Sequence, residues 1–196
     1  SGPVARGLNR VTWDLRMAPP VEGEPPAAGA AGAAGAAGGG GRGGAAVGPT
    51  VLPGKYRVTV KVPGMPAELR GELVVEGDPI TNFSDTDRRA RQAVVLGLYR
   101  LQKTLGVARN AARALAAQVA DIRKDIAAAG MPEAAPRADS LAAHITRVGA
   151  ELDRAFAAAS GHARAIDGFS GLPTADQRRQ VTWTFDDAGN AVADLN

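Results

Sequence analysis

The stretch that decides the fold is residues 85–129, DTDRRARQAVVLGLYRLQKTLGVARNAARALAAQVADIRKDIAAA. Its apolar side chains recur in alternating steps of three and four residues, at Leu98, Leu101, Leu105, Ala108, Ala112, Leu115, Val119, Ile122 and Ile126. This spacing keeps one apolar stripe on one face of an α-helix and suits packing against a partner helix. A helix of this length would span roughly 65 Å, so other helices are needed to cover its stripe.

Two further helices are predicted after this stretch. Residues 136–166 repeat the stripe with Leu141, Ile145, Val148, Leu152, Ala155, Ala159, His162 and Ile166. The short link through Gly130 and Pro132 makes the two helices antiparallel neighbours, a helical hairpin. A third helix over residues 174–196 packs beside them as a three-helix bundle. Ser84 with Asp87, and Thr174 with Gln177, have the spacing of helix-capping pairs.

The last helix has an alternative. Residues 181–185, VTWTF, also fit a strand, with residues 187–190 as a turn. We favour the helix because the apolar spacing continues through Leu195. Because the pattern is still running at that point, we expect the helix or the polypeptide to continue further.

The first half predicts a small β module. Residues 10–15, 56–62 and 69–75 alternate polar and apolar side chains, as half-buried strands do. Val11, Trp13 and Leu15 would share one face, and Tyr56, Val58, Val60 and Val62 would point inward. Three such strands suit an incomplete immunoglobulin-like antiparallel sandwich, completed by strands from upstream or from a partner. The predicted class is therefore α+β, with a β domain over residues 1–80 and a helical bundle over residues 81–196.

A low-complexity insertion separates the first two predicted strands, at residues 27–48. It consists of Ala-Ala-Gly repeats followed by a glycine tract, and it has no periodic apolar face to bury. Gly38, Gly40 and Gly43 match a G-x-G-x-x-G pattern, but no strand precedes it and no helix follows, so the match carries no meaning. We interpret the segment as a flexible insertion, or as a loop that a neighbouring subunit holds. The second interpretation makes Gly38, Gly40 and Arg42 candidate partner-binding residues.

Composition excludes several classes of function. Lys and Arg total 23 against 20 Asp and Glu, which is not the basic excess of a nucleic-acid binder. The chain has no Cys, so it has neither disulfides nor thiol chemistry. No apolar run approaches the length of a membrane span. We find no nucleophile with a nearby base, no phosphate loop and no metal-ligand spacing, and we expect no catalytic, cofactor or metal site. His144 and His162 lie about 27 Å apart on one predicted helix and cannot share a metal.

Two groups remain as candidate partner-binding residues. Arg88 and Arg89, at the start of the long helix beside Asp85 and Asp87, could meet an acidic partner or lipid headgroups; the alternative is a solvated helix end of mixed charge. Trp183 and Phe185 are the best aromatic anchors, although packing within the bundle is the more ordinary role for them.

Several motifs resemble one protein family. Residues 7–16, GLNRVTWDLR, resemble the G-x-N-x-x-x-W-D-L-R strand of bacterial sortilin-like proteins with sialidase-type (BNR-repeat) β-propellers, and residues 53–58, PGKYRV, resemble their P-G-x-Y-x-V strand. Asp78-Pro79 before a long helix and Pro173-Thr174-Ala175 before the last one match the same tail. The strand pair also resembles the immunoglobulin-like module of flagellar hook-capping proteins. The resemblance implies an exported protein whose propellers lie upstream. The propeller mark S-x-D-x-G-x-T-W does not occur in this sequence, so no catalytic residue carries over.

From these observations we expect a non-catalytic, extracytoplasmic (periplasmic) interaction or scaffold module. It would dock as an accessory subunit onto protein subunits of a larger assembly, for example a photosynthetic or respiratory membrane complex, near the membrane surface. One alternative is the supporting tail of a sialidase-like glycosyl hydrolase whose active site lies upstream. The other is a coiled-coil dimerisation module.

Overall fold

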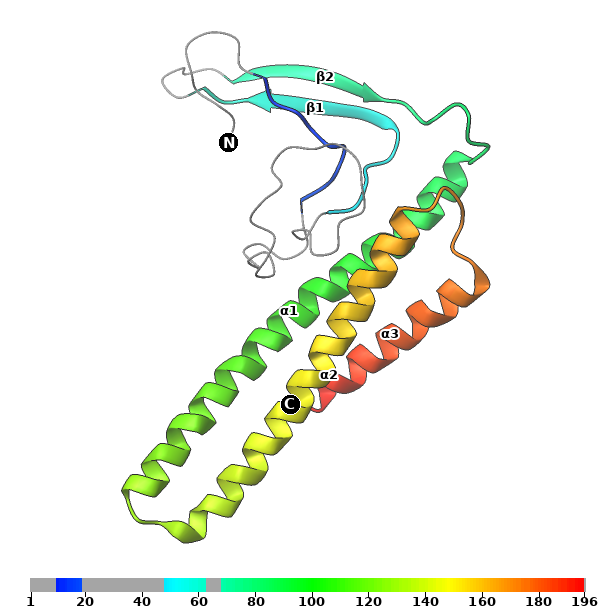
Figure 1. Cartoon of the computed structure of the whole chain (residues 1–196). Coiled ribbons are helices and arrows are strands. Elements are labelled where there is room, and N and C mark those ends of the chain that lie inside the picture. Colours follow the sequence, from blue (N-terminus) through cyan, green and yellow to red (C-terminus); the bar gives the residue numbers. More distant parts are fainter. Residues whose placement is uncertain (1–9, 19–47, 63–67, 196) are drawn as a thin grey trace.

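The computed structural model describes residues 10–18, 48–62 and 68–195. In this part of the chain it shows an α+β protein with a two-stranded antiparallel sheet and three helices (Figure 1). The elements are β1 (Gly54–Val60), β2 (Leu69–Val75), α1 (Asp85–Ala128), a 3-10 turn (Pro132–Ala134), α2 (Ala135–Asp167) and α3 (Ala175–Ala193). The helices form a long antiparallel hairpin, α1 and α2, with the shorter α3 packed against it.

The starts of α1 and α3 and the end of α1 follow from local sequence signals, as predicted, whereas α3 ends at Ala193 and does not continue through Leu195 as predicted. The Ser84 hydroxyl accepts a hydrogen bond from the Asp87 backbone N–H at 3.1 Å and caps α1. Gly130 ends the first helix with a φ of 65°, in the left-handed region that favours glycine. Thr174 and Gln177 form a complete capping box at the start of α3. The alternative strand and turn within residues 181–190 is wrong, because these residues lie inside α3.

The predicted stripes form the core where three helices meet. Two clusters of buried side chains fill it, one around Leu105, Val148 and Leu152 and the other around Leu98, Ala159 and Ile166. Ala188 and Ala191 of α3 complete the first cluster. The small alanines allow the helices to approach closely.

Part of the predicted stripe is exposed. Leu115, Ile122 and Leu141 retain 37%, 49% and 47% of their accessible surface. The reason is the length of α3, which ends at Ala193 and stops well short of the tip where α1 turns into α2 (Figure 1). Beyond the end of α3, the described residues form a hairpin of only two helices.

The two strands form a hairpin with one apolar face. Gly54 pairs with Val75 and Val60 with Leu69, so Tyr56, Val58 and Val60 share a face with Leu73 and Leu69. β2 matches the predicted strand at residues 69–75, whereas β1 begins and ends two residues earlier than the predicted strand at residues 56–62. The expectation that Val58, Val60 and Val62 point into a core is wrong, because these side chains are 43%, 47% and 39% exposed. In the described residues, no second sheet faces them.

The predicted first strand does not form. Among residues 10–18, only Arg16 makes a β-bridge, to Thr50. The backbone instead turns at Leu15, whose φ is 59°, and the Trp13 indole N–H donates to the Arg16 carbonyl at 2.9 Å. Asp14 stabilises the turn by accepting from the Arg16 N–H at 3.1 Å, which is the local hydrogen bonding that Asp favours in turns. Val11 is 75% exposed as a result.

Candidate functional site

A largely buried carboxylate, that of Asp167 at the end of α2, joins distant parts of the described chain. Its side chain is only 8% exposed and pairs with the Arg16 guanidinium at 3.0 Å. Asp167 also accepts hydrogen bonds from the Thr50 hydroxyl at 3.0 Å and from the Thr50 backbone N–H at 3.3 Å. Arg16 donates to the Gly48 carbonyl at 2.9 Å as well. We call this group, made of Arg16, Gly48, Thr50 and Asp167, the Asp167 clamp.

The clamp joins two segments near the N-terminus to the helical bundle. The Met17 N–H donates to the Pro49 carbonyl and the Val51 N–H to the Leu15 carbonyl, both at 2.9 Å. The Gln92 amide on α1 donates to the Thr50 carbonyl at 3.0 Å. A Cβ at Gly48 would lie 2.0 Å from the Met17 carbonyl oxygen, so only glycine allows this approach. The clamp therefore attaches the chain on either side of residues 19–47 to the bundle.

The clamp also affects a tyrosine of the core. Burial raises the pKa of Tyr99 above its ordinary value of 10.0, and the nearby charge of Asp167 raises it further, while Arg16 and Arg164 oppose this. The Asp167 carboxylate accepts from three donors, which hold it at the junction of the two segments and α2. Among the described residues, no three of His, Cys, Asp or Glu cluster closely enough to hold a metal ion.

The apolar side of the β-hairpin is the best candidate interaction surface. It consists of Val58, Val60, Leu69 and Leu73, which are 41–52% exposed, and we call it the hairpin face. The opposite side of the same strands carries Lys55, Arg57, Thr59, Arg70 and Glu72, together with Val74. Next to the hairpin face, on the same side of β1, Tyr56 is covered by a residue of the same chain: Trp13 packs edge-on against it with ring centroids 5.3 Å apart. An aromatic side chain from another segment thus already contacts this surface.

The predicted arginine pair has two different environments. Arg88 is largely engaged in the fold: it donates to the Phe83 carbonyl at 2.9 Å, and its guanidinium lies 5.6 Å from the Phe83 ring centroid. Arg91 lies over the same ring and donates to the Phe169 carbonyl. Arg89, in contrast, is exposed. Arg89 is therefore the more accessible of the two for a partner or a lipid headgroup.

The predicted aromatic anchors both lie on α3. Trp183 is 57% exposed and Phe185 is 42% exposed. The Phe185 ring also faces Gly97 of α1, where an added Cβ would lie 3.7 Å from the ring, so Phe185 lies between α3 and α1. Trp183 is thus the freer anchor. Gly38, Gly40 and Arg42, the remaining candidates, lie outside the described residues.

The two histidines are separate, as expected for positions five turns apart on one helix. A ring nitrogen of His144 lies 3.0 Å from the Asp194 carbonyl oxygen, and Arg147 beside it pairs with Asp194 at 3.1 Å. These contacts fix the end of α3 to α2. His162 is partly buried.

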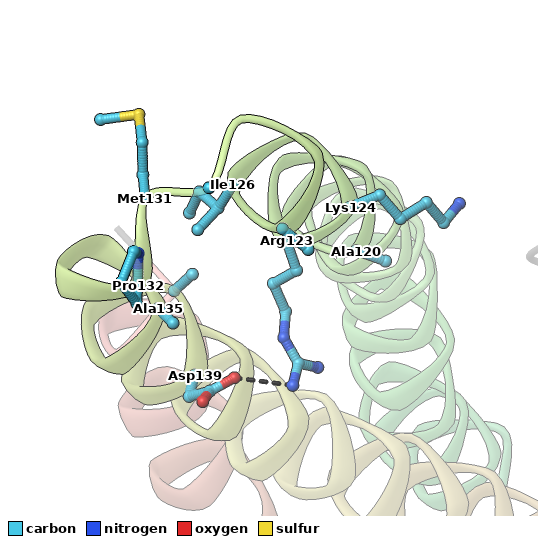
Figure 2. Close-up of a pocket in the computed structure, with 11 residues that line it drawn as sticks. Ala120, Arg123, Lys124, Ile126, Met131, Pro132, Ala135 and Asp139 are labelled. Carbon is cyan, nitrogen blue, oxygen red and sulfur yellow. Dashed lines mark ion pairs between the residues drawn. The ribbon is translucent and has the colours of Figure 1, made fainter.

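A pocket of about 570 Å³ lies between the helices at the hairpin tip (Figure 2). Alanines and the side chains of Ile126, Met131 and Pro132 line most of it. Arg123 reaches across from α1 to pair with Asp139 of α2 at 2.6 Å, and Lys124 points away from the pocket. The alanines leave this gap because they are too small to fill the space between the two helix ends.

Comparisons of the chain with models of protein families, with curated proteins and with solved structures gave no match. The structure also contains, in its described part, no helix with the length and apolarity that a membrane crossing requires.

Sequence reasoning missed the Asp167 clamp. Arg16 and Thr50 lie far from Asp167 in the sequence, and no motif links them. The one usable signal was the quoted W-D-L-R stretch, in which an aspartate two residues before an arginine favours a turn as well as a strand.

Proposed function

We propose that this chain is a non-catalytic, extracytoplasmic interaction module that docks as an accessory subunit onto a larger protein assembly. The observation that carries the proposal is the hairpin face, whose aliphatic side chains are 41–52% exposed on a sheet of two strands. A hairpin of this size is marginal alone and gains stability when another sheet or strand covers its apolar side.

The partner in this proposal supplies strands that complete an immunoglobulin-like sandwich over the hairpin face. A partner strand that pairs along the edge of the hairpin satisfies the open backbone groups there, and pockets for alternate side chains add selectivity. The Asp167 clamp supports this role, because it holds segments next to the hairpin on a rigid bundle. Trp183 and Arg89 add exposed anchors elsewhere on the surface. We propose a peripheral position on a photosynthetic or respiratory membrane complex. We also propose that the resemblance to sortilin-like proteins reflects a family relation.

The test is affinity capture of the full chain from its source membranes, with mass spectrometry of bait and companions. Val58→Glu places a charge on the hairpin face, and Thr59→Glu places the same charge on the opposite side of the same strand. We expect wild type and Thr59→Glu to retain stoichiometric membrane-complex subunits, and Val58→Glu to lose them. Equal capture by both variants would refute docking through the hairpin face. A much longer native bait carrying propeller peptides would favour the supporting tail of a sialidase-like hydrolase instead.

The exposed stripe on the helical hairpin favours a second candidate, the coiled-coil dimerisation module. That stripe lies on a different part of the chain from the hairpin face, and the two functions do not exclude each other.

A further inference from the structure

The tip of the helical hairpin has an apolar surface that the described part of the chain leaves uncovered. It consists of Leu115 and Ile122 on α1 and Leu141 on α2, and we call it the distal stripe. These side chains continue, at seven-residue steps, the positions of Ala108 on α1 and Val148 on α2. Ala108 and Val148 are 8% and 0% exposed. The same helical face therefore changes from buried to exposed along the length of the hairpin.

The change occurs where α3 ends. Ala108 and Val148 belong to the core cluster that Ala188 and Ala191 of α3 complete. Asp194, next to the end of α3, contacts His144 and Arg147. Between this level and the tip, the two long helices are the only elements among the described residues (Figure 1). Because residues seven apart lie on nearly the same side of a helix, the distal stripe is a direct continuation of the surface that already binds α3.

We propose that the distal stripe is a self-association surface, on which two copies of this chain pair tip to tip as a four-helix bundle. The three side chains of the distal stripe are aliphatic and uncharged, so they can pack against the same three side chains of a second copy, as a two-fold interface requires. Nearer the sheet, the same face of α1 and α2 packs against a helix, α3. A helix is therefore the kind of element that this face binds. A second copy thus supplies the missing helices with no new kind of contact.

Steric constraints select an antiparallel arrangement. In a parallel pair, the two α3 helices would both lie between the hairpins and keep the stripes apart. In the antiparallel pair, the two tips overlap side by side, and the three-helix parts of the two copies lie at opposite ends of the dimer. The tip of each copy then lies beyond the end of the other copy's α3, with the Ile122 side chains close to the two-fold axis.

The size of the surface indicates a weak dimer. From Leu115 to the end of α1 the hairpin extends about 20 Å, and two helices side by side are roughly 20 Å wide. Each copy would bury roughly 400 Å², about half of the ~800 Å² per partner of a typical stable interface. We therefore expect association that depends on concentration rather than a permanent dimer.

The test is sedimentation velocity of the purified full chain, from about 1 μM to about 500 μM, the range in which a weak complex dissociates. The wild-type mass should rise toward twice that of the monomer. Ile122→Glu should weaken dimerisation at least tenfold. The matched control is Ala117→Glu, which adds the same charge to an exposed position about 140° around α1 from Ile122. Circular dichroism confirms that both variants are folded.

A second measurement uses the absence of Cys from the chain. Ile122→Cys should form a disulfide-linked dimer under mild oxidation, and Ala117→Cys should not. A wild type that stays monomeric over the whole range, or equal effects of the two glutamate variants, would overturn the proposal. The result is separable from the proposed function, because self-association is measured without a partner and Val58→Glu should leave it unchanged.

Discussion

Replacing Asp167 with alanine should release the segments around Arg16 and Thr50 from the bundle without unfolding the bundle. The substitution removes the acceptor of three hydrogen bonds, from the Arg16 guanidinium and from the Thr50 hydroxyl and backbone N–H. The two buried core clusters do not include Asp167. The loss should therefore appear as local opening rather than as global unfolding.

The magnitude follows from the exposure of the partners. Removing one partner of a fully buried ion pair costs about 3–5 kcal/mol, and a hydrogen bond to a charged group contributes about 1.5–3 kcal/mol. The Arg16 side chain is 34% exposed, so it can be hydrated after the loss, and it keeps its bond to the Gly48 carbonyl. We expect a decrease of about 2–3 kcal/mol in the free energy of local opening, or roughly 30- to 150-fold.

Hydrogen exchange provides the assay. The N–H groups of Met17 and Val51 bond to backbone carbonyls across the two segments, and their exchange should accelerate by that factor. Amides near Leu105 and Leu152 should change little. Asp121→Ala is the control, since its pair with Lys124 is solvent-exposed on both sides and contributes little. Unchanged exchange at Met17 and Val51, or equal acceleration in the helical core, would refute the reasoning.

The remaining predictions concern the core, a cap and one close approach. Tyr99 has a raised pKa in the fold, so its contribution to stability is complete below pH 10.0 and is lost as the pH rises through the folded-state pKa; denaturant unfolding of wild type against Tyr99→Phe should show this loss only in wild type, and parallel curves would contradict it. Gly48→Ala should cost about 1–3 kcal/mol of local opening energy, because the new Cβ would overlap the Met17 carbonyl, and normal exchange at Met17 would argue against the close approach. Thr174→Ala should lower unfolding free energy by about 1 kcal/mol through the lost cap, whereas Thr174→Ser should not. Leu152→Ala, at a fully buried position, should cost about 2–5 kcal/mol in the same assay, and a loss below 1 kcal/mol would contradict its place in the core.

The candidate surfaces were only partly predictable. Trp183 and Phe185 were identified as anchors from their residue type, but the choice between bundle packing and exposure needed the position of α3. In the structure, the Phe185 ring faces Gly97 of α1, whereas the Trp183 side chain is 57% exposed. Arg88 and Arg89 are adjacent in the sequence, and only the positions of Phe83 and its carbonyl separate their environments.

The sequence by itself determined the helices, because their signals are local. The spacing of apolar residues, the capping pairs at Ser84 and Thr174 and the stop at Gly130 act within one or two turns, and the structure agrees with each of them. Only the tertiary structure decided what covers each apolar surface. The turn at Leu15, which has local hydrogen bonds with the Asp14 and Trp13 side chains, formed in place of a predicted strand. The ion pair of Arg16 with the distant Asp167 attaches this turn to the bundle. The distal stripe is exposed because α3 is short, and no local pattern within α1 or α2 encodes where a third helix ends.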